Sequence, residues 1–305
     1  MDIESAYDHV RSGGTGSYEQ KRGLIAVWGK EANQFLDGLI SNDMKTLEDG
    51  GQMLAAFPNA QGRLLAVVRV LREGDRFLFE TENTTRVKVF DNLFRFTYAG
   101  DFFVEDLSEQ FGFFEVFGDV TTERPAHRFT NSGSTGYFIL NEFVDEFRKD
   151  LIDAGAVKLS GEVHEIIRIE NGVPLFGVDM DEATIVPELG LEGLISYNKG
   201  CYIGQEIIAR IHFRGHVAKR LTGLIFETEM WGNGENGMEL TSQDGKAAGS
   251  IRSTVFSPKL GKSIALAYVR YDYLAEGTQL GIGSEAASVA SLPFVSSVIK
   301  PAKAI

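Results

Sequence analysis

Cysteine is almost absent from this 305-residue sequence, which contains only Cys201. A single cysteine excludes an internal disulfide framework, and it excludes a zinc or iron-sulfur site that one chain builds from several cysteines. So few cysteines are typical of a protein from a reducing compartment, and we expect a cytoplasmic location.

Other absences narrow the class of function. Acidic residues outnumber basic residues by 43 to 30, which gives a formal net charge of -13. This excess disfavours broad neutralisation of phosphates, so we expect no nucleic-acid partner. Residues Met1 to Ser5 show neither a basic nor an apolar region, so no signal or transit peptide is expected. No apolar run reaches the length of a membrane span, so no membrane partner is expected.

The composition is that of an ordinary globular protein, with 43% apolar and 11% aromatic residues. At this length it can bury the cores of two or three domains. The pattern of residues 1–110 predicts an α+β unit. In order along the chain, it indicates a strand, a short helix, a three-strand meander, a second helix and a final strand. The predicted elements are 24–28, 31–40, 52–57, 64–71, 77–81, a helix beginning at 84 or 85, and 102–105.

The rest of the chain divides into three further regions. Residues 111–160 predict a second α+β unit, in which strands precede an amphipathic helix. Residues 161–216 form a connecting segment, part of which is expected to complete the first unit. From 217 to 305, short strands separated by turns predict a small antiparallel β-barrel.

Cys201 lies within the stretch Asn-Lys-Gly-Cys-Tyr-Ile-Gly-Gln-Glu, residues 198–206, which leads into a helical pattern of isoleucines. The thiol is therefore expected at or just before a helix N-terminus. The helix dipole and the charge of Lys199 would stabilise a thiolate there, which favours a reactive cysteine. A small apolar residue that fills a helix-loop junction explains Cys201 equally well.

Two pairs near this cysteine have simpler explanations. Glu206 and Arg210 stand four residues apart with the acid first, the spacing of a helical ion pair. His212 and His216 lack a cysteine or carboxylate partner at zinc-binding spacing, so we expect no metal site.

Glu170 follows an apolar run and precedes Gly172-Val173-Pro174, so it is expected at a helix end. A carboxylate there can accept paired N–H donors from a pterin or guanine-like ring through charge-assisted hydrogen bonds. A solvent-facing cap residue is the alternative, and the pattern by itself favours that alternative.

The stretch from Lys199 to Glu206, together with Arg210, resembles the signature of the folate-binding YgfZ family. This family is related to the aminomethyltransferase, or T-protein, of the glycine cleavage system. The resemblance extends over nearly the whole chain. It is carried further by residues 35–43, 62–65, 168–174, 187–188, 249–253 and 264–270.

The resemblance implies a three-domain α+β ring, in which two ferredoxin-like units and a C-terminal antiparallel β-barrel surround a central channel. It implies that the channel binds tetrahydrofolate or a one-carbon derivative. It also implies a monomer that serves the assembly or repair of iron-sulfur clusters, with client enzymes or assembly factors as partners. Cys201 is then the functional thiol, and the implied folate-binding residues are Glu170, Asn42, Lys199, Tyr202, Gln205 and Arg210.

One departure from the T-protein pattern bears on catalysis. The T-protein strand that corresponds to the one after Gly62 carries an aspartate, whereas residues 63–68 here read Arg-Leu-Leu-Ala-Val-Val. No carboxylate is available on this strand, and an alanine or a valine cannot supply the charged group that aminomethyl transfer needs beside the reacting nitrogen. A classical aminomethyltransferase is therefore disfavoured, although Asp43 could provide an acid from another segment. Two alternatives stay open: a folate-dependent one-carbon transferase with another amine donor, and a protein-binding scaffold whose folate pocket is vestigial.

Overall fold

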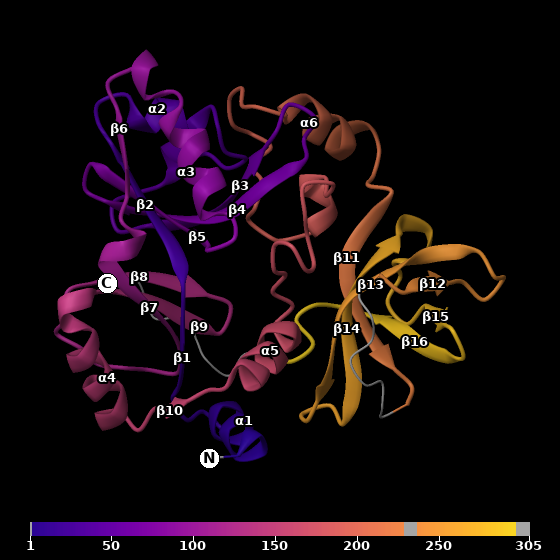
Figure 1. The fold of residues 1–305 in the computed structure, drawn as a ribbon. Coiled ribbons are helices and arrows are strands. Elements are labelled where there is room, and N and C mark those ends of the chain that lie inside the picture. The colour runs from indigo at the N-terminus through magenta and orange to yellow at the C-terminus, as the bar shows by residue number, and fades with distance from the viewer. Residues whose placement is uncertain (1, 229–236, 297–305) are drawn as a thin grey trace.

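The protein, described from a computed structural model over residues 2–228 and 237–296, has three parts arranged around a central opening. Figure 1 shows two α+β units stacked on one side and a β-barrel on the other, with helix α5 and an irregular connecting segment between them. This mixed α+β architecture with a closed C-terminal antiparallel barrel confirms the fold class expected from the sequence.

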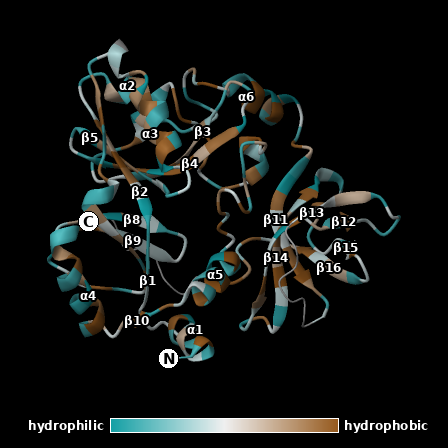
Figure 2. Cartoon of the chain, in the orientation of Figure 1, coloured by the Kyte–Doolittle hydropathy of each residue, from teal (hydrophilic) through white to brown (hydrophobic). Residues whose placement is uncertain are grey.

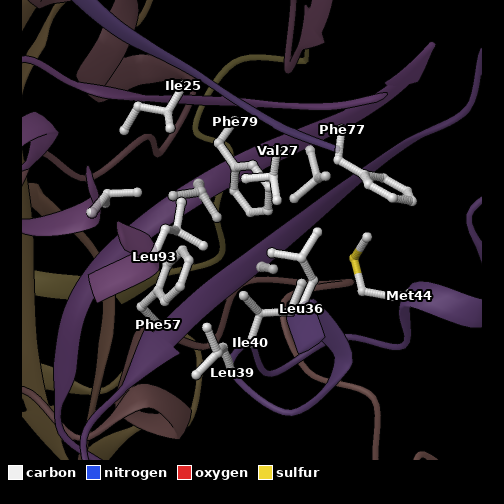
Figure 3. Close-up of a cluster of buried hydrophobic side chains, with 14 of the residues drawn as sticks. Ile25, Val27, Leu36, Leu39, Ile40, Met44, Phe57, Phe77, Phe79 and Leu93 are labelled. Atoms are coloured by element: carbon white, nitrogen blue, oxygen red, sulfur yellow. The ribbon is translucent and has the colours of Figure 1, made fainter. Parts of the chain in front are cut away.

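The first unit is a sheet with strand order β3-β4-β5-β2-β6, covered on one face by helices. Figure 3 shows the apolar side chains between the sheet and helices α2 and α3, among them Ile25, Phe57, Phe79 and Leu93. Burial of each such side chain stabilises the fold by roughly 1.5–3 kcal/mol, so this cluster holds the helices in place. The elements are β2 (Arg22–Trp28), α2 (Ala32–Asp37), β3 (Gln52–Pro58), β4 (Leu64–Glu73), β5 (Arg76–Glu82), α3 (Arg86–Phe94) and β6 (Phe103–Asp106).

The two faces of β5 serve different neighbours. Phe77 and Phe79 face the helices, whereas Leu78 packs with side chains of the second sheet. Since side chains alternate along a strand, Glu80 and Glu82 lie on the same face as Leu78. Both carboxylates therefore point away from the first core and towards the centre of the molecule.

The second unit is built from segments that are far apart in the sequence. Its sheet has the order β10-β1-β7-β9-β8, in which Gly16 of β1 pairs with Val157 of β10 and with Phe117 of β7. Helix α4 packs on one face of this sheet, and α1 packs against α5 beside it. The elements are α1 (Ile3–Arg11), β1 (Gly16–Gln20), β7 (Phe111–Phe117), β8 (Ala126–Asn131), β9 (Ser134–Leu140), α4 (Val144–Asp153), β10 (Val157–Lys158) and α5 (Gly161–Glu170).

This pairing corrects the domain boundaries expected from the sequence. Residues 3–20 belong to the second unit and not to the unit assigned to 1–110, because β1 finds its hydrogen-bond partners in β7 and β10. Helix α5 also joins the second unit, whereas residues around Val186 and Ile208 pack on the first. The region 161–216 is thus shared between the two units.

The C-terminal part is a barrel in which β11-β14-β13-β12-β15-β16 close on one another. Its interior is apolar and includes Leu224, Ile251 and Ala267. Gly281 and Ile282 end strand β15, where they pair with Ala286 and Glu285 of β16. Residues 229–236 and 297–305 of the expected barrel region lie outside the described residues. The strands are β11 (Lys219–Phe226), β12 (Glu239–Thr241), β13 (Ala247–Ser257), β14 (Lys262–Arg270), β15 (Gln279–Ile282) and β16 (Glu285–Ala290).

Helix α5 joins the second unit to the barrel. Figure 2 shows both hydrophobic and hydrophilic residues along it, and its Ile169 packs against the outer face of the barrel. Arg168 is buried and forms an ion pair with Asp179, in which Arg168 Nη1 lies 2.7 Å from Asp179 Oδ2. The Nη2 group of Arg168 also donates a hydrogen bond to Ser253 Oγ of β13 over 3.2 Å. These contacts fix the spacing between the parts that surround the centre.

The connecting segment returns the chain to the first unit. Leu64 of β4 donates its N–H to the carbonyl of Thr184 over 2.8 Å, and the short 3-10 helix Val186–Leu189 follows. Helix α6 (Gln205–Arg214) then lies over the turn between β3 and β4. Within the described residues, we find no helix with the length and apolar character of a membrane span.

Candidate functional site

The centre of the molecule contains a cavity of about 540 Å³, which is in the range of small-molecule sites. All three parts contribute to its wall, so the ring arrangement creates it. Both apolar and charged side chains line it, so it can hold an apolar group and orient it by polar contacts. The lining includes Leu54, Val67, Leu189, Leu191, Leu221 and Leu292, with Arg22, Arg69, Glu80, Glu82, Asn171 and Arg220 as polar members.

Two carboxylates and two guanidinium groups share one wall of this cavity. The sheet register pairs Arg69 of β4 with Glu80 of β5, and Arg22 of β2 with Glu82 of β5. Arg22 Nε donates to Glu80 Oε1 over 2.6 Å, and Arg69 Nη1 lies 3.4 Å from Glu80 Oε2. Glu80 is 2% exposed, so both of its oxygens are buried against cations.

Glu82 has a different environment. Both of its oxygens accept from the Phe176 N–H at 3.1 Å, and among the described residues no side chain donates a hydrogen bond to it. Burial raises the pKa of Glu82, and the nearby Arg22 only partly offsets that effect. A carboxylate that is half-buried in a cavity wall and lacks a side-chain donor can accept hydrogen bonds from a ligand.

Glu170 lies at the end of α5, as expected, but its side chain does not line this cavity. It is fully buried and accepts hydrogen bonds from Tyr7 Oη at 2.7 Å, from Arg11 and from Ser257. The carboxylate therefore joins α1 and α5 to strand β13. It is neither a solvent-facing cap nor directed at the central cavity, and its role in binding a folate stays a prediction.

Cys201 lies elsewhere on the molecule. The thiol is exposed and borders an open hollow of about 900 Å³, whose lining shares no residue with the central cavity. Helix α6 begins at Gln205, so Cys201 precedes it by four residues and does not occupy its first turn. The hollow is lined further by Ala60, Tyr202, Ile203, Gly204, Gln205, Glu206, Ala209, Arg210, Phe213 and Arg214.

Lys199 is turned away from the thiol and into the first unit. Its Nζ donates to the carbonyl oxygens of Asp37, Ile40 and Asn42 at 2.6, 2.9 and 2.7 Å, and it lies 3.2 Å from Asp37 Oδ1. Burial lowers the pKa of Lys199, and the Asp37 carboxylate opposes that effect. The ammonium group thus anchors the motif to the end of α2 and contributes no donor to either cavity.

The other predicted site residues divide between structural contacts and the surface. Asn42 Nδ2 donates to the carbonyls of Leu54 and Gly193 at 2.8 and 2.7 Å. Gln205 Oε1 accepts from the Tyr202 N–H at 2.8 Å, which closes the turn before α6. Burial raises the pKa of Tyr202 to about 12, so its hydroxyl stays neutral. Their role in binding a folate stays a prediction.

Arg210 is exposed on α6, beside the thiol hollow. The predicted helical pair does not form, since no ion pair joins Glu206 to Arg210 among the described residues. His212 stacks on Tyr197 with ring centroids 3.6 Å apart, and His216 stacks on Tyr271 at the same distance. In residues 2–228 and 237–296, no group of histidine, cysteine and carboxylate side chains is arranged to hold a metal ion.

Sequence reasoning missed the charged wall of the central cavity. A signal was present in the run Phe77-Leu78-Phe79-Glu80-Thr81-Glu82, where two acids at alternate positions interrupt an apolar strand. The acid considered from another segment, Asp43, instead caps the 3-10 helix Met44–Thr46 and accepts from the Lys45 N–H at 3.0 Å.

A ring of two α+β units and a closed barrel is the fold of glycine cleavage aminomethyltransferases. The structure superposes with a TM-score of 0.86 on aminomethyltransferase T of the glycine cleavage system from Bartonella henselae, covering 98% of this chain and 91% of that one. The two sequences are 20% identical, so this likeness shows the fold alone.

The sequence comparisons add detail to this class. Residues 219–296 match the glycine cleavage T-protein C-terminal barrel domain. The chain is 28% identical over 229 residues to a protein named iron-sulfur cluster assembly factor IBA57 homolog, mitochondrial, from Mycosarcoma maydis. That match covers 67% of this chain and spans about half, 55%, of the relative. An aminomethyltransferase from Rubrobacter xylanophilus is 26% identical over 277 residues, which cover 81% of this chain and 73% of the relative. The chain therefore has an aminomethyltransferase-like fold with a T-protein barrel domain.

Proposed function

We propose that this protein binds a reduced folate, tetrahydrofolate or a one-carbon derivative, in the central cavity. We further propose that it acts as an accessory factor in the assembly or repair of iron-sulfur clusters, of the YgfZ type. The observation that carries the proposal is the cavity of about 540 Å³ with a charged wall, at the centre of an aminomethyltransferase-like fold. The resemblance to the IBA57 homolog supports the link to iron-sulfur clusters.

In this proposal the folate and the thiol work at separate places. The ring of the folate lies in the central cavity, whereas Cys201 meets a client enzyme or an assembly factor at the outer surface. Lys199, Asn42 and Gln205 hold the loop that presents the thiol, and Arg210 borders the same hollow. We place this activity in the cytoplasm and assign it to a monomer.

Two measurements test the two halves of the proposal. Calorimetric titration with 5-formyltetrahydrofolate, an air-stable reduced folate, should show saturable binding to the full chain. Cells that lack the protein should recover the activity of an iron-sulfur enzyme when given the unsubstituted chain but not Cys201→Ser. If the protein binds folate but Cys201→Ser restores the enzyme activity as well as the unsubstituted chain does, the thiol has no part in the function. If the protein does not bind reduced folate, the proposed folate binding is overturned.

A folate-dependent one-carbon transferase is the second candidate, and the relatives named aminomethyltransferase favour it. The cavity acids Glu80 and Glu82 come from β5, so the lack of an acid in the first residues of β4 does not leave the cavity without carboxylates. This candidate predicts formation of methylenetetrahydrofolate when amine donors are supplied. Binding without turnover across a broad set of amines would leave the accessory role. If the affinity for a client protein is the same with and without folate, the protein acts instead as a scaffold.

A further inference from the structure

Helix α6 is little covered by the rest of the protein. It lies at the rim of the molecule between the first unit and the barrel (Figure 1), and Ile208 is its buried residue. Arg210, Phe213 and Arg214 are exposed, and all three line the thiol hollow. At about 100° per residue they fall within an arc of about 100° on the helix surface, so they form one face. We call these three residues the α6 face.

The charge of this region differs from that of the whole chain. Residues 207–226 contain no aspartate or glutamate, whereas the chain has 43 acids and a formal net charge of -13. The lining of the thiol hollow carries Arg210 and Arg214 against one acid, Glu206, among the described residues. The hollow is therefore a basic region on an acidic protein.

The two guanidinium groups of the α6 face are free to bind another molecule. Among the described residues, neither Arg210 nor Arg214 forms an ion pair or a hydrogen bond. Elsewhere, Arg86 and Arg148 each pair with two carboxylates. Residues four apart on a helix are neighbours, and like charges at this spacing repel each other. A partner that brings carboxylates to the two arginines would relieve this repulsion.

An apolar ring lies beside these charges. Phe213 is 67% exposed, and its ring meets His212 edge to face with centroids 4.7 Å apart. His212 in turn stacks on Tyr197 at 3.6 Å. Because its neighbours hold the ring in place, little conformational entropy is lost when another side chain packs on it.

The chemistry of the α6 face favours a protein partner over a nucleic acid. Binding of nucleic acid depends on many neutralised phosphates, whereas this face has two free cations on a chain of net charge -13. The rings nearby already stack in pairs, Tyr197 with His212 and His216 with Tyr271, so their facing surfaces cannot stack on bases. Arginine and aromatic side chains are instead enriched in protein interfaces.

We propose that the α6 face docks an acidic segment of a partner protein. Two carboxylates about one helical turn apart in that segment pair with Arg210 and Arg214, and an apolar side chain between them packs on Phe213. This inference rests on the proposed function, because the partner is the protein that meets Cys201. Since Cys201 lines the same hollow, docking at the α6 face brings the partner beside the thiol.

Disulfide trapping at Cys201 tests this surface, because tethering raises the local concentration of a weakly bound peptide. Cys201 is the single cysteine of the chain and is exposed, so the peptides are trapped at one place. The acidic probe is a helical peptide with two glutamates one turn apart, a leucine between them and a cysteine capped by 2-mercaptoethanol. The basic probe has lysines in place of the glutamates. Mass spectrometry of the full chain measures the trapped fraction at low ionic strength.

We expect the acidic probe to be trapped at least about 10-fold more than the basic probe, because two attractive pairs replace two repulsive ones. The preference should fall below about 3-fold at high salt, which screens exposed charges. An acidic probe with alanine in place of the leucine should be trapped at least about 3-fold less, because its contact with Phe213 is lost. These comparisons use the unsubstituted chain, so they need no variant to fold.

Variants assign the preference to particular side chains. Arg210→Gln combined with Arg214→Gln should reduce the preference for the acidic probe to below about 3-fold. Phe213→Ser should remove the difference between the leucine and alanine probes. The matched control is Arg76→Gln combined with Arg95→Gln, since these exposed arginines change the net charge equally but do not line the hollow. The control should keep the full preference.

Equal trapping of the acidic and basic probes by the unsubstituted chain would overturn the docking surface. A preference that survives in Arg210→Gln combined with Arg214→Gln would overturn it as well. A single-stranded oligouridine that binds more tightly than the acidic probe, and loses affinity in the same double variant, would assign the face to nucleic acid instead.

The proposed function is tested separately, by whether Cys201→Ser restores the iron-sulfur enzyme in cells. If it does restore the enzyme while the acidic probe is still preferred, the docking surface stands and the proposed role of the thiol fails. If the preference is absent and Cys201→Ser does not restore the enzyme, the docking surface is wrong and the role of the thiol stands.

Discussion

Lys199 Nζ lies 3.2 Å from Asp37 Oδ1 and donates to the carbonyl of the same residue over 2.6 Å. The side chain of Lys199 is 1% exposed, so the signature motif is attached to the first unit through a buried cation. The Ile203 N–H adds a hydrogen bond to the Gly38 carbonyl, and together these contacts set the path of the chain past Cys201.

Lys199→Met should lower the free energy of unfolding by about 2–4 kcal/mol, because it removes the buried cation beside Asp37 and the shared donor of three carbonyl oxygens. Lys45 provides a matched control, since its exposed ammonium group also faces Asp37, at 3.7 Å. Lys45→Met should cost less than about 0.5 kcal/mol, as is usual for exposed pairs. Urea unfolding of both variants measures the difference, and equal losses would contradict the anchoring role.

Substitution by alanine should affect the stability of the protein differently at two glycines of the motif, Gly200 and Gly204. Gly204 has a φ of 81°, and a Cβ there would overlap the Asn59 carbonyl oxygen. Gly204→Ala should therefore lower stability by about 2–3 kcal/mol. No atom lies within 4 Å of a Cβ added at Gly200, so Gly200→Ala should change stability by less than about 0.5 kcal/mol. Thermal unfolding checks both, and a large loss for Gly200→Ala would show that the loop is packed differently.

The thiol of Cys201 should react with a disulfide reagent such as Ellman's reagent in the native protein. Since it is exposed, we expect one equivalent to react without denaturant and none in Cys201→Ser. Saturation with reduced folate should leave the rate unchanged, because the thiol hollow and the central cavity have no lining residue in common. A thiol that reacts only after unfolding would contradict its exposure. Strong protection by folate would contradict the separation of the two cavities.

Glu115 should make stability depend on acid pH. Burial by itself raises the pKa of this carboxylate, but the charge of His164 and hydrogen bonds with His164 at 2.8 Å and Ser134 at 2.6 Å lower it to about 2. The folded pKa lies below the ordinary value of 4.5, so the contribution is present above that pH and is lost as the pH falls towards 2. Its size is about 3 kcal/mol.

The measurement for Glu115 compares the unsubstituted chain with Glu115→Gln by urea unfolding between pH 7 and pH 3. The difference in unfolding free energy should be largest at neutral pH and should shrink as the pH falls below about 4.5. Glu142→Gln, at an exposed position, should give a small difference at every pH. A difference for Glu115→Gln that does not change with pH would show that its charge does not stabilise the fold.

Much of the fold could be predicted from the sequence because its signals are local. The meander from Gln52 to Glu82 and the barrel strands are short, largely apolar runs between turn residues, so their existence follows from local composition. Strand β1 was missed because Gly16 to Gln20 is short and mostly polar. Its strand conformation depends on β7 and β10, which lie 90 or more residues further on.

The candidate site, like strand β1, depends on contacts between segments that are far apart in the sequence. Alternation along β5 places Glu80 and Glu82 on one face, but only the assembled ring shows that this face borders a cavity. Glu170 was recognised as an unusual acid at a helix end, yet its partners Tyr7 and Ser257 come from opposite ends of the chain. The identity of a functional acid here depends on contacts between distant segments, which no local pattern contains.

The pairing of β1 with β10 also determines the order in which the protein can form during synthesis. Residues 22–106 contain every strand of the first sheet, so this unit can fold soon after it leaves the ribosome. Residues 16–20 emerge earlier but lack a complete sheet until Val157 and Lys158 have been made. Residues 16–20 are therefore among the last of the second unit to find their place, and the long-range pairing makes the second unit the slower of the two α+β units to fold.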